Sequence, residues 1–193
     1  MDKSTEAMLA FALGLCVLAA WYGEFRLRRK TGGAEGFWPG TTLAPAAAYL
    51  IAASGAILIT IGEAAVEMRF EVSETQSQLP LVALLGLIGA AVTEEAVFRG
   101  FAAPSHFTGR KLLALILGGS AVFAAIHIDF LNFNLHDEKQ VITLVFEFLT
   151  AVWLYLARFN PLNPTRSLLP CFMGHIVRNL AVFGIKWAQG FVN

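Results

Sequence analysis

Residues 79–103 read LPLVALLGLIGAAVTEEAVFRGFAA, an apolar run with two adjacent acids, Glu94 and Glu95, and one basic residue, Arg99. The run is long enough for a helix that crosses the hydrocarbon core of a bilayer, which takes about 20 residues. A charged side chain at the centre of such a helix costs about 2.5–3.5 kcal/mol on insertion scales. Three charges in this place therefore indicate a functional site within a membrane protein.

The composition of the whole chain supports the same class. Of its 193 residues, 56% are hydrophobic and 15% are charged, whereas soluble domains average about 25% charged residues. Six apolar segments are each long enough, or nearly so, to span a bilayer: 7–23, 36–62, 79–103, 112–131, 141–157 and 168–190. We predict an all-α fold, a polytopic membrane bundle of about six transmembrane helices with an intramembrane polar cavity. We expect residues 1–193 to form a single integral membrane domain.

Two later segments carry polar residues at helical spacing. Phe123 and His127 are four residues apart, and so are His175 and Asn179, so each pair lies on one face of a helix. Lipid cannot satisfy such groups, so these polar stripes and the acids are expected to converge inside the bundle. A carboxylate there can take a proton from water, and a histidine or an amide can donate hydrogen bonds to a developing oxyanion. These are the groups that hydrolysis needs.

The ordered set Glu-Glu-x-x-x-Arg, Phe-x-x-x-His and His-x-x-x-Asn resembles the CPBP family of intramembrane endopeptidases, which includes the type II CAAX prenyl proteases and bacterial Abi-type relatives. The resemblance covers about residues 80–190, which would be the catalytic core. It implies that Glu94 activates water and that His127 helps to position that water. His175 and Asn179 would stabilise the oxyanion.

Glu95 and Arg99 stand four residues apart, a spacing that lets them pair on one helix. We count both among the catalytic-site residues because such a pair would hold the motif in place. A purely structural ion pair is the alternative for these two residues.

Five other residues are predicted to lie outside the catalytic set. Trp21, Trp38 and Tyr155 are expected to be interfacial aromatic residues. Asp129 is expected at a helix end. Glu147 is either close to the substrate or interfacial, depending on where its helix begins.

A metal is the main mechanistic alternative. Glu94, His127 and His175 would suffice for a catalytic zinc site with an open water position. However, no His-Glu-x-x-His helix is present, and the three residues come from separate segments. We therefore favour a glutamate-activated water with no metal and no other cofactor, and keep zinc as the alternative.

The resulting interpretation is an intramembrane endopeptidase that hydrolyses a peptide bond in or near the membrane. A proton- or ion-coupled transporter would also bury such charges, but inverted repeats, its usual mark, are not visible. A non-catalytic membrane immunity or scaffold protein is the second alternative. The expected partners are a membrane-anchored protein or peptide substrate and the lipid bilayer, with no nucleic acid. The resemblance implies that a short chain with six spans is a bacterial or archaeal member of the family, so we expect a prokaryotic plasma membrane.

Overall fold

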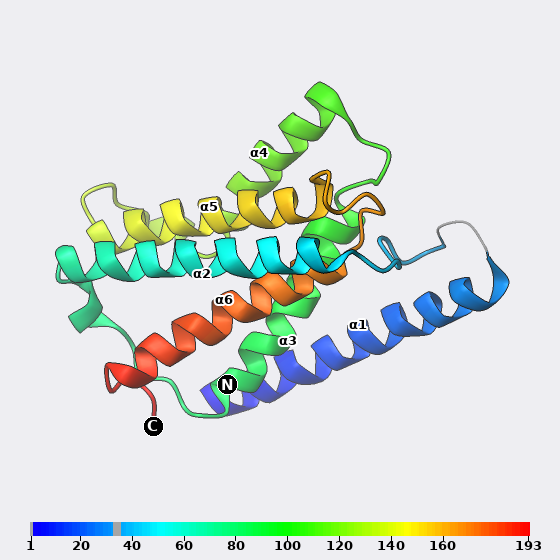
Figure 1. Cartoon of the computed structure of the whole chain (residues 1–193). Coiled ribbons are helices and arrows are strands. Elements are labelled where there is room, and N and C mark those ends of the chain that lie inside the picture. Colours follow the sequence, from blue (N-terminus) through cyan, green and yellow to red (C-terminus); the bar gives the residue numbers. More distant parts are fainter. Residues whose placement is uncertain (1, 33–35) are drawn as a thin grey trace.

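Figure 1 shows the computed structural model of the protein, in which residues 2–32 and 36–193 are described. These residues form six α-helices: α1 (Lys3–Thr31), α2 (Ala46–Arg69), α3 (Ala83–Glu95), α4 (Gly109–Ala125), α5 (Glu138–Phe159) and α6 (Leu169–Ala188). Three short helical turns accompany them: η1 (Val72–Thr75), η2 (Ala96–Phe101) and η3 (Phe130–Asn132). The described residues contain no named strand, only one isolated bridge between Leu79 and Val192. The predicted all-α fold is confirmed.

Three of the described helices, α1, α2 and α5, are long and apolar enough to cross a membrane. Figure 1 shows α2 and α5 side by side and antiparallel, with α6 packed against α2. The other helices are shorter or carry the polar groups of the motifs. The fold is a helical membrane bundle, as the sequence predicts.

The start of the second segment differs from the prediction. It was expected at residue 36, but α2 begins at Ala46. Pro45 precedes the helix in an extended conformation, and Gly40 adopts a left-handed backbone with φ of 61°, which only glycine adopts without strain. The Gly40 carbonyl accepts a hydrogen bond from the Leu168 amide. The chain ahead of α2 is therefore a connection that packs against the start of α6.

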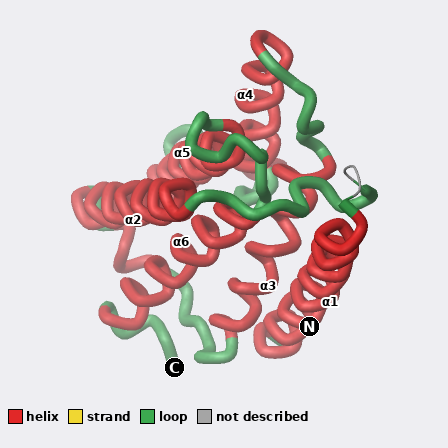
Figure 2. Tube along the Cα trace, turned by 45° about the vertical axis from the view of Figure 1, so that its right-hand side comes forward, coloured by secondary structure: helices red, strands yellow, loops and turns green. Residues whose placement is uncertain are grey.

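Small residues bring α1 and α3 into close contact, and Figure 2 shows the two helices next to each other. Gly14 faces Gly89, and a Cβ at Gly89 would overlap the backbone of Ala10 and Phe11. Such small-residue contacts are common between membrane helices because they let two backbones approach. The packing fixes α3, and with it the two acids at its end.

Two aromatic residues contradict the prediction of an interfacial position. Trp21 is 2% exposed and Tyr155 is fully buried, while Trp38 is half-buried. The Trp21 indole donates to the Pro39 carbonyl, and the Tyr155 hydroxyl donates to the Phe98 carbonyl. The indole N–H and the phenol hydroxyl are therefore both hydrogen-bonded inside the protein, and neither residue depends on water at the membrane surface for a hydrogen bond.

Candidate active site

The two acids lie at the last two positions of α3, directly before a π-helical turn. Consecutive residues of a helix point in different directions, so Glu94 and Glu95 face different neighbours. π-Helical turns are rare and frequently occur at functional sites. The turn carries Arg99, which it places next to Glu95.

Glu95 is fully buried and binds two other motif residues. Its Oε1 accepts a hydrogen bond from Arg99 Nη1 at 3.1 Å and lies 2.8 Å from His175 Nδ1. Because a carboxylate only accepts hydrogen bonds, His175 Nδ1 carries a hydrogen here. The second ring nitrogen of His175, Nε2, is thereby turned toward Glu94.

Arg99 is buried between aromatic rings as well as paired with Glu95. Its guanidinium carbon lies 4.4 Å from the centre of the Phe123 ring and 4.8 Å from that of Tyr155. Rings at this distance attract a cation, more strongly where water is excluded. Tyr155 is thus part of the environment of the site, a role that its sequence context did not reveal.

Glu94 is the accessible acid of the pair. Its Oε2 lies 3.8 Å from His127 Nε2 and 3.8 Å from His175 Nε2, and the Glu94 and His127 side chains are each 27% exposed. His127 Nδ1 is 2.7 Å from the Phe123 carbonyl, so Nδ1 carries a hydrogen and Nε2 is the nitrogen that faces Glu94. Two imidazole nitrogens thus face one carboxylate oxygen, and the Glu94 and His127 side chains are partly accessible.

Asn179 lies one turn after His175 on the same face of α6. Its side-chain amide donates to the Leu87 carbonyl of α3 at 2.9 Å, and the residue is 7% exposed. The contact links α6 to α3. The structure therefore brings Glu94, Glu95 and the two histidines together, with Glu95 hydrogen-bonded to His175 and Glu94 3.8 Å from both histidines. Asn179 follows His175 by one turn and has one amide hydrogen left after its bond to Leu87.

Asp129 lies at a helix end, as predicted. Its side chain accepts hydrogen bonds from the side-chain amide of Asn132, at 2.8 Å, and from the Asn132 backbone. These hydrogen bonds to the charged form lower the pKa of Asp129. The residue is the N-cap of the η3 turn.

The arrangement of the side chains bears on the metal alternative. Within the described ranges, no group of three or more His, Cys, Asp or Glu side chains is arranged so that it could hold a metal ion. Zinc would require ligand atoms about 2.0–2.2 Å from the ion. The zinc alternative therefore stays a prediction, as does a water activated by Glu94 without a metal.

A family model with the description Type II CAAX prenyl endopeptidase Rce1-like matches residues 76–181. The match covers more than half of the chain and includes all six predicted site residues. A comparison with curated proteins gave no match, and neither did a comparison with solved structures.

Proposed function

The chain belongs to the Type II CAAX prenyl endopeptidase Rce1-like family and is a membrane protease, and on that premise we propose that Glu94 activates the water that attacks the peptide bond. The main support is the position of Glu94, whose Oε2 faces Nε2 of both His127 and His175 at 3.8 Å. Groups at that separation are too far apart for a direct hydrogen bond but can share a bridging water. Family membership also favours a protease over the transporter and the scaffold.

The proposed reaction begins with a water that donates one O–H to Glu94 and the other to a histidine Nε2. Glu94 takes a proton as the water oxygen bonds to the scissile carbonyl carbon, whose oxygen becomes negatively charged. When the tetrahedral intermediate collapses, the C–N bond breaks and Glu94 returns the proton to the leaving nitrogen. The products are a carboxylic acid and an amine, and the enzyme is unchanged.

Oxyanion stabilisation is assigned to α6. When protonated on both nitrogens, His175 donates from Nδ1 to Glu95 and from Nε2 to the developing oxyanion. The remaining amide hydrogen of Asn179 is the second proposed donor. Both groups come from one helix face, which fixes their relative positions.

Glu95 and Arg99 are proposed to position the reacting groups. Glu95 orients the His175 ring, and Arg99 compensates the charge of Glu95 in a site without solvent. No metal is part of this proposal. Glu94 is the only acid of the pair with access to substrate.

The family acts on membrane-anchored proteins, and we assign this chain a membrane-anchored protein or peptide substrate in a prokaryotic plasma membrane. The test is co-expression with a reporter whose C-terminal CAAX sequence is prenylated. Glu94→Gln should abolish cleavage while the protein still accumulates in the membrane. Glu6→Gln, the same change at an exposed position of α1, should cleave at the wild-type rate. Wild-type cleavage by Glu94→Gln would refute the assignment.

A further inference from the structure

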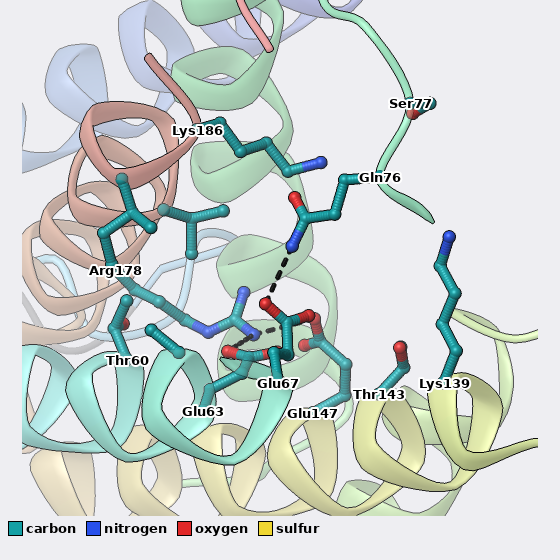
Figure 3. A pocket seen from close by; sticks show the side chains of 13 residues that line it. Thr60, Glu63, Glu67, Gln76, Ser77, Lys139, Thr143, Glu147, Arg178 and Lys186 are labelled. Atoms are coloured by element: carbon teal, nitrogen blue, oxygen red, sulfur yellow. Dashed lines mark hydrogen bonds and ion pairs between the residues drawn. The ribbon is translucent and has the colours of Figure 1, made fainter. Parts of the chain in front are cut away.

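The two halves of the site come from different helices, and each half is bound to α5. On α6, Arg178 lies three residues after His175. It donates from Nη2 to Glu147 Oε1 of α5 at 2.9 Å and to Glu63 Oε2 of α2 at 3.1 Å, and Figure 3 shows these three side chains at the wall of a cavity. Glu147, which the sequence left between a position near the substrate and an interfacial one, is 8% exposed and lies between helices. The helix that carries His175 is thereby fixed to α5.

The other half of the site lies on a helical run whose end needs donors from elsewhere. α3 and η2 follow each other directly, and the run ends at Phe101. The last four carbonyls of a helix lack a partner within the regular helical pattern, and here they include those of Phe98 and Gly100. A buried carbonyl without a hydrogen bond costs free energy. Donors from a neighbouring helix can therefore fix this end of the run.

α5 supplies these donors from one face. Tyr155 and Arg158 are three residues apart, so their side chains lie on the same side of the helix. The Tyr155 hydroxyl donates to the Phe98 carbonyl at 3.1 Å. Arg158 is fully buried, and its Nη1 donates to the carbonyls of Gly100 at 3.3 Å and Ala103 at 2.7 Å. The end of a helix also carries a partial negative charge that attracts a cation, so Arg158 binds the end of η2 both by hydrogen bonds and by its charge.

Arg99 depends on this backbone for its position. Across residues 2–32 and 36–193, its Nε and Nη2 make no hydrogen bond, and Nη1 alone binds Glu95 Oε1. The guanidinium is therefore placed by the η2 backbone from which it extends and by the aromatic rings around it. The same Glu95 oxygen lies 2.8 Å from His175 Nδ1. A displacement of η2 would thus move Arg99 away from Glu95 and alter the hydrogen bond that orients His175.

We propose that Arg158 and Tyr155 are positioning residues for the reaction. They hold the end of η2 against α5, so that Arg99, Glu95 and His175 stay aligned. The inference rests on the proposed function for the roles of Glu95 and His175. It adds α5, which carries none of the three sequence motifs, as the frame to which both halves of the site are fixed. Neither positioning residue is assigned a contact with the substrate.

The test measures cleavage of a prenylated peptide by the purified full chain in lipid nanodiscs, with each rate divided by the folded fraction of the preparation. Arg158→Met removes the donors and the charge but keeps an unbranched side chain. It should lower kcat about tenfold or more, because a displacement of about 1 Å at the reacting groups can cost about 100-fold in rate. KM should stay at the wild-type value, since Arg158 is assigned no contact with the substrate. Tyr155→Phe removes one hydrogen bond and should lower kcat about threefold.

Arg166→Met is the matched control. Arg166 donates to the carbonyls of Ser105 and Phe107, which lie in the same connection but beyond η2. Its loss should lower stability and leave kcat per folded molecule at the wild-type value. A second readout is the NMR spectrum of protein with isotope-labelled histidine, in which the His175 Nδ1 resonance is identified by its absence from His175→Gln. That resonance should shift in Arg158→Met and stay in place in Arg166→Met, a difference that a purely structural role of Arg158 would not produce.

Three results would overturn the inference: a wild-type kcat in folded Arg158→Met, an equal loss of kcat in Arg166→Met, or an unchanged His175 resonance in Arg158→Met. If Arg158→Met does not fold, Tyr155→Phe decides by the same two readouts, and a wild-type kcat with an unchanged resonance would overturn the inference. Glu94→Gln is measured on parallel preparations. Cleavage at the wild-type rate by that variant would refute the proposed function alone, because the NMR readout does not depend on cleavage.

Discussion

Removal of the Arg99 guanidinium should destabilise the protein much more than removal of the Glu94 charge. Arg99 and Glu95 are both fully buried and 3.1 Å apart. Coulomb's law with an effective dielectric constant of about 20 gives roughly 5 kcal/mol for unit charges at that distance. Breaking a buried pair from one side costs about 3–5 kcal/mol, because the remaining charge is left uncompensated. We therefore expect Arg99→Met to lose about 4 kcal/mol of stability.

The assay is denaturant unfolding of the purified protein in detergent, together with its level in the membrane. Glu94→Gln is the matched control, because Glu94 is partly exposed and its side chain lies 3.8 Å from the nearest histidine nitrogens. It should change stability by less than about 1 kcal/mol. The double variant Glu95→Gln with Arg99→Met should be more stable than Arg99→Met alone, since it leaves no unpaired carboxylate. Equal stability of Arg99→Met and Glu94→Gln would refute this reasoning.

Three further predictions concern packing, hydrogen bonding and metal. Gly89→Leu should lower the melting temperature and the yield, because α1 leaves no space for a side chain at that position. Gly118→Leu is the control and should change neither, because the space around Gly118 is open. Equal effects of the two substitutions would contradict the α1–α3 packing. Tyr155→Phe should lower the free energy of unfolding by about 1 kcal/mol, because the Phe98 carbonyl loses its hydrogen-bond donor. Thermal melting measures this loss, and an unchanged melting temperature would contradict the hydrogen bond. The purified protein should contain well under one zinc per chain by elemental analysis, and His127→Ala should lower turnover without changing metal content. Stoichiometric zinc that disappears in both His127→Ala and His175→Ala would contradict glutamate catalysis.

The motif spacing predicted the local geometry well. Glu95 and Arg99 do pair across one helical turn, and His127 and His175 do face Glu94. The first relation follows from helical periodicity, and the second from the cost of polar groups in lipid, which favours their convergence inside the bundle.

Long-range contacts of residues outside the three motifs could not be predicted in the same way. Tyr155 was expected at the interface because a tyrosine near a segment end usually has a water-facing hydroxyl, but a carbonyl of η2 satisfies it instead. The pairing of Glu147 with Arg178 depends on how α5 and α6 are packed. The start of α2 was predicted too early, because residues 36–45 are apolar enough to be taken as the first part of the membrane span that follows them. Pro45 and the left-handed Gly40 prevent that helix.

The most direct test of the proposed mechanism compares the two adjacent acids in one assay. Purified wild type, Glu94→Gln and Glu95→Gln in liposomes are given a prenylated peptide, and each cleavage rate is divided by the folded fraction of that preparation. The mechanism predicts that Glu94→Gln is folded and inactive, because its base is gone, and that Glu95→Gln is less stable but keeps measurable activity per folded molecule. A folded Glu94→Gln that cleaves at the wild-type rate, alongside an inactive Glu95→Gln, would contradict the assignment of Glu94 as the base.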